Sequence, residues 1–319
     1  MIFGRRALRL LQPTGCVQVE ALRCVRRFGP EPRCEICAQV CPEDAIHYDG
    51  RTPTVDEQRC TSCRLCEAAC PADAMHGDER DLEALAAELA RTPQPVLGCR
   101  VEGVQANVRS GCLGFLESEA LLALALALPA GVTLNLSRCA KCRNAPVAER
   151  LDAALAAVRA LPGDPAAERL RLVRDPDQLG FQETNLSRRS FFGALGKGSA
   201  GAAAKIVAPL GDSSPGKPAR KALPPRRLLL LRGLATLPAS QREILEDALF
   251  PTLRFLPSCD HCTGCDGICP SGAITTSTAD PPRPIFLRAL CTGCGACAAF
   301  CGEDGIALTP ARHGAIPAA

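Results

Sequence analysis

The chain has 319 residues, which is enough for two or three domains, and its formal net charge of +3 is nearly balanced. That balance favours neither nucleic acid nor a strongly acidic partner, and a chain with no tryptophan and a single tyrosine (Tyr48) is not expected to stack on bases. The longest apolar run, residues 120–128, ends at Pro129 and is too short to span a bilayer.

The composition is unusual in its cysteines, of which there are 21. A chain so rich in cysteine is either a disulfide scaffold or a metal protein. Residues 1–11 are short and basic and lack the long apolar stretch of a secretory signal. We therefore expect reduced thiols that bind metal, in a soluble protein of the cytoplasm.

Residues 1–80 contain two cysteine runs. The second run has the spacing C-x2-C-x2-C-x3-C, and the first is a shortened copy of it. The short run is Cys34, Cys37 and Cys41, and the complete run is Cys60, Cys63, Cys66 and Cys70. Residues 45–49, between them, are predicted to form a strand of a short hairpin. Each run ends in a related phrase, Cys-Pro-Glu-Asp-Ala-Ile and Cys-Pro-Ala-Asp-Ala-Met, which indicates an internal repeat.

Residues 81–176 alternate helical stretches with short β-branched runs. We predict helices over 82–90, 116–128 and 147–160, and strands over 96–99, 132–136 and 169–173. This alternation indicates a small α/β domain with a short parallel sheet. Four more cysteines lie in it: Cys99, Cys112, Cys139 and Cys142. Because strand ends of an open α/β sheet converge at one edge, these thiols predict a metal site there, filled by a 2Fe–2S cluster, a 4Fe–4S cluster or zinc, with unligated buried cysteines as the alternative.

Residues 177–225 are rich in Gly, Ser, Pro and basic residues, so we predict a flexible linker. Within it, the sequence from Ser187 to Phe192, Ser-Arg-Arg-Ser-Phe-Phe, has the form of a twin-arginine export motif. Export signals are read at N-termini, so we interpret this stretch as a basic linker and keep the cytoplasmic assignment. A relic of gene fusion and a docking stretch for an assembly chaperone stay open as alternatives.

Residues 226–319 begin with a strand-like stretch, 227–231, and a capping-box sequence, Ser240 to Glu243, ahead of a helix that ends near Phe250. We expect this segment to pack on the cysteine runs that follow it. Two complete runs come next, with a predicted strand at 284–287 between them. They are Cys259, Cys262, Cys265 and Cys269, and then Cys291, Cys294, Cys297 and Cys301.

The repeated spacing is the one that wraps a cubane 4Fe–4S cluster, since two-residue gaps turn three sulfurs onto one face of the core. A single C-x2-C would be weak evidence because zinc sites use it too, but four aligned copies indicate iron and sulfide. The C-terminal pair of runs resembles bacterial two-cluster ferredoxins, in which the fourth cysteine of each run ligates the other cluster. The resemblance implies one site of Cys259, Cys262, Cys265 and Cys301, and another of Cys291, Cys294, Cys297 and Cys269.

The N-terminal pair of runs resembles the same family, which implies a site of Cys60, Cys63, Cys66 and Cys41. The other site has only Cys34, Cys37 and Cys70, because Glu31 stands where the family has its first cysteine. We favour Cys24 as the replacement ligand. The alternatives are Cys16, and a three-cysteine cluster with an open or non-cysteine corner.

The central residues loosely resemble the delta-type iron–sulfur subunit of methanogen hydrogenase–heterodisulfide reductase assemblies. That likeness is limited to a strand, a helix, a second strand and a trailing cysteine pair, and it would imply a 2Fe–2S cluster. The fold class we predict is α+β, with two ferredoxin-like dicluster modules, residues 1–80 and 226–319, flanking the small α/β domain and the linker.

We expect four 4Fe–4S clusters, a fifth metal site, and a multi-cluster electron-transfer protein, either a free carrier or the wire subunit of a larger oxidoreductase. Its partners would be redox proteins, above all a larger flavin-, molybdenum- or tungsten-containing subunit, because this chain offers no organic cofactor site. Two other functions stay open: an enzyme with chemistry at an open iron, and an iron–sulfur redox sensor or assembly factor.

Overall fold

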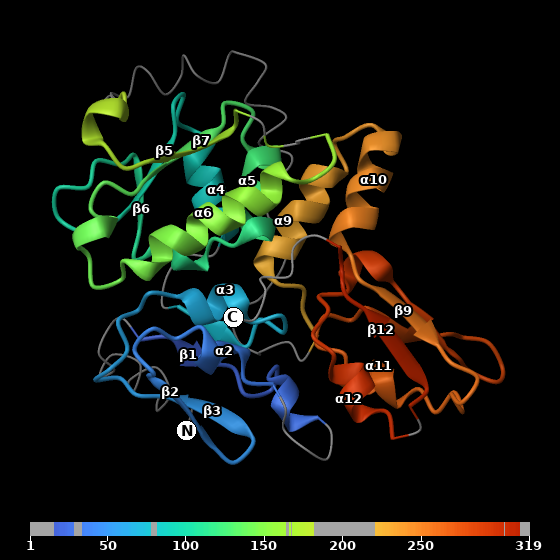
Figure 1. Ribbon diagram of the computed structural model, residues 1–319. Helices are drawn as coiled ribbons and strands as arrows, with labels where there is room; N and C mark the ends of the chain where they lie inside the picture. The colour runs from blue at the N-terminus through green and yellow to red at the C-terminus, as the bar shows by residue number, and fades with distance from the viewer. Residues whose placement is uncertain are drawn as a thin grey trace, which may run out of the picture.

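The computed structural model describes residues 16–28, 34–77, 82–163, 166, 168–181, 221–302 and 304–312. We call residues 16–77 the N-terminal region, 82–181 the central region and 221–312 the C-terminal region. In Figure 1 the N-terminal region (blue) lies below the central region (teal to yellow-green), and the cysteine-rich part of the C-terminal region (red) lies beside it. The twin-arginine-like stretch and most of the predicted linker fall outside the described residues.

The central region is built on a four-stranded sheet with the order β6-β5-β7-β8, in which every pairing is parallel. Its strands are β5 (Val96–Cys99), β6 (Val108–Ser110), β7 (Val132–Asn135) and β8 (Leu170–Val173). Its helices are α4 (Leu82–Leu89), α5 (Ser118–Ala127) and α6 (Pro146–Arg159). The predicted helices and three of these strands are confirmed to within a few residues. The sequence did not reveal β6, since Val-Arg-Ser is too short to show a period.

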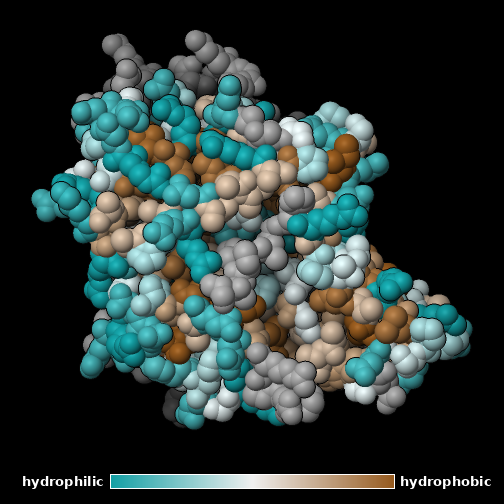
Figure 2. Space-filling model, viewed as in Figure 1, coloured by the Kyte–Doolittle hydropathy of each residue, from teal (hydrophilic) through white to brown (hydrophobic). Residues whose placement is uncertain are grey.

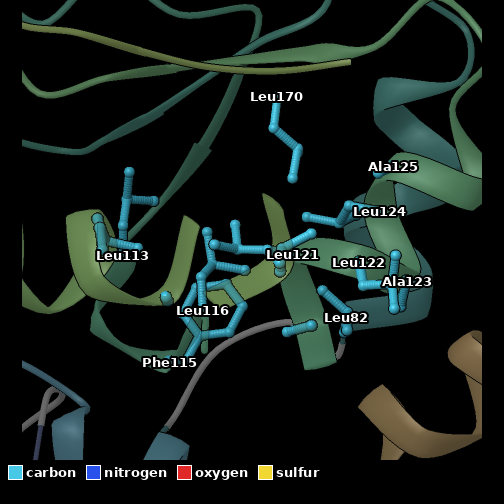
Figure 3. Packing of buried hydrophobic residues seen from close by; sticks show 14 of the residues in the cluster. Leu82, Leu113, Phe115, Leu116, Leu121, Leu122, Ala123, Leu124, Ala125 and Leu170 are labelled. Atoms are coloured by element: carbon cyan, nitrogen blue, oxygen red, sulfur yellow. The ribbon is translucent and has the colours of Figure 1, made fainter. Parts of the chain in front are cut away.

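Helix α5 forms the centre of the hydrophobic core. Nine of its ten residues are buried, which is the pattern of a helix that neighbours cover on every side. In Figure 3, Leu170 points from β8 toward Leu121 and Leu124 of α5. Glu117 caps this helix, because its carboxylate accepts hydrogen bonds from the backbone N–H groups of Glu119 and Ala120, at 2.6 and 2.9 Å.

The N-terminal region consists of two small antiparallel sheets and two short helices. Strand β1 (Gln18–Val19) pairs with β4 (Met75–His76), so the ends of the region meet, and β2 (Ile46–Asp49) and β3 (Thr52–Val55) form a hairpin between the cysteine runs. The hairpin confirms the strand predicted at 45–49, and Gly50 at its turn has φ +70°. The short helices are α2 (Ile36–Gln39) and α3 (Leu65–Ala69), with the 3-10 turn η1 (Val25–Arg27) ahead of them.

The C-terminal region repeats this order of elements. Strand β9 (Thr252–Phe255) precedes its first cysteine run and pairs with β12 (Ile306–Thr309), which follows the second. The strands β10 (Ile274–Thr276) and β11 (Pro284–Phe286) pair between the runs, and β11 confirms the strand predicted at 284–287. Two short helices, α11 (Gly264–Ile268) and α12 (Ala296–Phe300), lie within the runs. Figure 2 shows apolar surface over both the central and the C-terminal regions, and Ile285, Leu287 and Phe300 of the C-terminal region are exposed.

Two further helices, α9 (Pro225–Leu234) and α10 (Ala239–Leu249), correct the sequence predictions. Residues 227–231 are helical and not a strand, because proline at the first helical position and the following Arg and Leu residues favour a helix. The capping box is also wrong: α10 begins at Ala239, directly after Pro238, and no side chain caps it. The segment contacts the second cysteine region as expected, since Arg227 donates to the carbonyls of Ala289 and Cys291. It also packs elsewhere, because Leu229, Leu230, Leu234 and Leu245 are buried in the core that surrounds α5. None of the described helices is long and apolar enough to cross a membrane.

Helix α9 packs closely on α5 at a glycine. A Cβ added to Gly233 would stand 2.7 Å from the Cβ of Leu126. The mutation Gly233→Leu should therefore separate the two helices and lower the free energy of unfolding by about 1–3 kcal/mol. Anaerobic chemical denaturation followed by circular dichroism measures the change. Gly267→Ala is the control, because a Cβ there meets nothing within 4 Å; an equal loss in both variants would contradict close packing at Gly233.

Candidate metal centres

The cysteines gather into five groups of four, which we number as sites. Site 1 is Cys24, Cys34, Cys37 and Cys70, site 2 is Cys41, Cys60, Cys63 and Cys66, and site 3 is Cys99, Cys112, Cys139 and Cys142. Site 5 is Cys269, Cys291, Cys294 and Cys297. The four cysteines of each of these sites line one cavity, and every cysteine is a free thiol.

Site 4 is Cys259, Cys262, Cys265 and Cys301, and two observations connect its members. Cys259 and Cys262 lie near enough to Cys265 to raise the pKa of its thiol, which burial raises most. Gly305 donates its backbone N–H to the Cys301 sulfur at 3.2 Å, and a Cβ on Gly305 would stand 2.9 Å from the Cα of Cys259. Cys301 therefore lies on the Cys259 side of the region.

The loops that carry the thiols have a repeated left-handed backbone. In each of the three complete runs the residues on both sides of the second cysteine have φ between +54° and +73°. These are Ser62 and Arg64, His261 and Thr263, and Gly293 and Gly295. Four of the six carry a Cβ, for which such backbone is uncommon. Alternation of left- and right-handed residues turns successive N–H groups inward to form an anion-binding concavity of the kind found at iron–sulfur sites.

A second repeat follows the last cysteine of each run. The third residue after it has φ between +44° and +72° in all four runs, at Asp44, Asp73, Gly272 and Asp304. Backbone N–H groups then donate to the cysteine sulfur: Ala45 to Cys41 at 3.3 Å and Ala74 to Cys70 at 3.2 Å, like Gly305 to Cys301. An N–H donor stabilises negative charge on sulfur, so these loops are suited to thiolates that hold an anionic core.

The structure places Cys24 with Cys34, Cys37 and Cys70 around one cavity. Arg26 holds the two segments together: its guanidinium donates to the carbonyl of Cys34 at 2.8 Å and lies over the ring of Tyr48, 3.9 Å from the centroid. The Tyr48 hydroxyl is 3.6 Å from the Cys37 sulfur. Cys16 lies elsewhere, beside Cys60 of site 2, with its sulfur 3.7 Å from the carbonyl oxygen of Glu57.

Site 3 lies at the carboxyl edge of the central sheet and lines a cavity of about 530 Å³. Burial raises the pKa of Cys112 and of Cys139 to about 11, and neighbouring thiols add to both shifts. Asn144 is buried there, with an amide oxygen that has no partner and an amide nitrogen that donates to the carbonyl of Thr61 at 3.2 Å. A buried acceptor of this kind indicates a group or water in the cavity.

In none of the five sites do the sulfurs meet at a point, since no three His, Cys, Asp or Glu side chains of the described residues are placed to hold a single metal ion. Zinc would need all four sulfurs about 2.3 Å from one centre. A cubane or a 2Fe–2S rhomb instead fills a volume between them, so thiols that surround a cavity fit a multinuclear core. Burial raises the pKa of the Cys66 thiol well above its usual value and those of Cys294 and Cys297 to about 12, so these sulfurs need a cation to become thiolates.

The sites form a row. Cys112 of site 3 lies near Cys63 of site 2, and Cys66 of site 2 lies near Cys37 of site 1. In the C-terminal region, Cys297 of site 5 lies near Cys265 of site 4. Sites 1 and 5 are joined through Ala222, whose N–H donates to the carbonyl of Pro270 at 2.9 Å and whose carbonyl accepts from Arg23 at 2.9 Å. The order along the fold is therefore site 3, 2, 1, 5 and 4.

Sequence reasoning missed the buried arginines that fix these sites. Arg64 occupies a left-handed position beside Cys63, pairs with both carboxylate oxygens of Glu67 at 2.8 Å, and lies 3.9 Å from the ring centroid of Phe115 in the central region. Its guanidinium also donates to the hydroxyl of Ser110 at 3.3 Å. An arginine beside a cysteine gives no sequence signal of burial, because most arginines are exposed.

The comparisons with known proteins agree with part of this geometry. Residues 32–74 match the model of the 4Fe-4S dicluster domain family, which contains seven of the eight cysteines of sites 1 and 2 and leaves out Cys24. Residues 32–74 thus fit a ferredoxin-like module with 4Fe–4S clusters, and the match supports an iron–sulfur electron-transfer protein in general. No curated protein and no solved structure matches the chain.

The mutation Arg64→Ala should separate the N-terminal and central regions. It leaves Glu67 without its buried partner, so we expect the free energy of unfolding to fall by about 3–5 kcal/mol. Anaerobic guanidinium denaturation measures the change. Arg174→Ala is the control, because Arg174 and Asp152 form an ion pair with both side chains 50% exposed, and its loss should cost about 1 kcal/mol or less. Equal losses in the two variants would contradict the role assigned to Arg64.

Proposed function

We propose that the protein is a multi-cluster electron-transfer protein with a 4Fe–4S cluster at each of sites 1, 2, 4 and 5. The observation that carries this proposal is that thiols in all three complete runs share one left-handed loop geometry, and one of those runs lies within the residues matched by the dicluster family. The shared order of strands and helices in the N- and C-terminal regions supports a second dicluster module at 226–319. Residues 81–176 would be a separate α/β domain, and 177–225 the linker.

The clusters, when bound, supply one-electron redox chemistry. The chain supplies the ligands and the surroundings of the clusters. Cysteine sulfurs from distant segments would hold the cores, and backbone N–H groups donate to sulfurs of three sites. Cysteines of sites 1 and 2 belong to the packed core around α5, and those of sites 4 and 5 to a second apolar cluster. A row of neighbouring sites suits electron transfer through a protein, because an electron can step from one site to the next.

The cavities of the described residues bear on the partner and on the second candidate function. Four of the cavities among the described residues are lined by four cysteines each, which suits them to hold clusters, and bond-making chemistry would belong to a partner subunit that carries flavin, molybdenum or tungsten. Site 3 is the exception in size, since its cavity of about 530 Å³ is far larger than the cavities of sites 1, 2 and 5. That observation favours site 3 over an open corner at site 1 for the second candidate function, an enzyme with chemistry at an exposed iron.

The metal content of anaerobically purified protein tests the proposal. Four cubanes give about sixteen irons and as many sulfides per chain, a 2Fe–2S cluster at site 3 raises the iron to about eighteen, and a fifth cubane raises it to about twenty. Elemental analysis with electron paramagnetic resonance of the reduced protein measures this. A folded preparation that holds zinc and no iron would overturn the proposed function.

Variants of the two candidate cysteines test the fourth ligand of site 1. Cys24→Ser should lose iron from one cluster, or convert it to a three-iron form with a changed resonance signal, because the sulfur of Cys24 lines site 1. Cys16→Ser should keep all the iron, since Cys16 lies beside Cys60 and outside site 1. The reverse pattern, or full iron in both variants, would contradict the assignment of Cys24.

A further inference from the structure

The N-terminal and C-terminal regions meet at a buried cluster of charged residues, which we call the junction. The cysteine spacing does not predict it. Three arginines and three carboxylates form it: Arg23, Arg226, Arg227, Asp73, Glu117 and Glu119. Their side chains are between 5% and 18% exposed. Asp73 pairs with Arg23 at 3.5 Å and with Arg226 at 3.4 Å, Glu117 pairs with Arg226 at 3.6 Å, and Glu119 pairs with Arg227 at 2.6 Å. Desolvation of six such groups is costly, so each depends on the ion pairs and hydrogen bonds that it makes in the junction.

Two adjacent arginines of this junction point to different cysteine sites. The guanidinium of Arg226 donates to the carbonyl of Cys70, in site 1, at 2.7 Å. The guanidinium of Arg227 donates to the carbonyl of Cys291, in site 5, at 2.6 Å, and to that of Ala289 at 3.0 Å. Both begin helix α9, which is anchored on α5 in the central core, so one rigid helix fixes the backbone of both sites at once.

The effect of the junction on the clusters depends on which of its charged groups contact the two cysteine carbonyls. The junction holds three arginines and three acidic side chains, of which burial raises the pKa of Glu117 to about 7, and the groups that touch the two cysteine carbonyls are guanidiniums. Glu119, on α5, pairs with Arg227, while Asp73, in the loop after Cys70, lies near the Cys70 thiol together with Arg226. A positive charge next to a cluster ligand stabilises the reduced cluster, which carries one more negative charge, and so raises its reduction potential.

We propose that Arg226 and Arg227 are positioning residues that hold sites 1 and 5 together as one inter-module pair and raise the potentials of both. This inference rests on the proposed function. It makes the two dicluster modules one continuous path within the chain, in place of two carriers joined by a flexible linker. The apolar contact of Val25 and Phe28, next to Cys24, with the core around site 5 belongs to the same junction.

The test is redox titration of the full chain, purified anaerobically and followed by electron paramagnetic resonance, with signals assigned through Cys24→Ser and Cys294→Ser. Arg226→Gln should lower the potential of the site 1 cluster and Arg227→Gln that of the site 5 cluster, each by about tenfold in the equilibrium constant for reduction, which is about 59 mV for one electron. Glu119→Gln should shift the site 5 potential in the opposite direction, because it removes the carboxylate that faces Arg227 and keeps the arginine.

Arg232→Gln is the matched control. It removes the same charge from the same helix, at an ion pair with Glu83 whose side chains are 13% and 21% exposed, and it should leave all four potentials unchanged. Arg226→Lys and Arg227→Lys keep the charge if the glutamine variants fail to fold, and should retain most of the potential. Potentials that stay fixed in the glutamine variants, or that move equally in the control, would overturn the inference while the clusters of the wild type still support the proposed function. A wild type without reducible clusters would overturn the proposed function itself.

Discussion

Buried arginines that donate to the carbonyls of cysteine residues are the interactions on which the arrangement of this protein depends. Arg26 donates to Cys34, Arg226 to Cys70 and Arg227 to Cys291. A thiol can be held in place only if the backbone that carries it is fixed, and the cysteine loops are short and poor in regular structure. A guanidinium supplies several donors in a rigid plane, so one side chain can fix a loop and also pair with a buried carboxylate. The positive charge it brings is the one that a cluster with anionic sulfurs favours.

The same logic explains why the loops adopt left-handed backbone at residues with side chains. Ser62, Arg64, His261 and Thr263 each accept an uncommon conformation, which costs of order 1–3 kcal/mol, because it turns the N–H groups toward the cavity between the sulfurs. Asp44, Asp73 and Asp304 do the same after the last cysteine of a run. Because the same left-handed conformation recurs in every complete run, we infer that binding of a cluster offsets its cost. The first run departs from this pattern, since Glu35 has φ −129°, and there Arg26 fixes the loop.

Much of the local structure could be predicted from the sequence. The helices of the central region and strands β5, β7 and β8 have clear periods or β-branched runs, and the cysteine spacing indicates which sulfurs share a loop. The predictions that were wrong also have local causes. Residues 227–231 form an apolar run that is too short to distinguish strand from helix by its period; Pro225 at the first helical position favours a helix, and the packing of Leu229 and Leu230 in the core around α5 stabilises it. Ser240 has the right neighbours for a capping box, but the residue at the N-cap is Pro238, two positions earlier.

The sequence by itself determined the cysteine runs, their repeat and the class of cofactor that their spacing fits, because a loop of two or three residues between ligands is a local property of the chain. Only the tertiary structure decided that Cys24 and not Cys16 lies at site 1, that Cys112 of the central region approaches Cys63, and that α9 joins sites 1 and 5. Those relations join residues tens to hundreds of positions apart. They follow from which faces of α5 and α9 are buried and from which buried charges must find partners, and no local pattern contains that information.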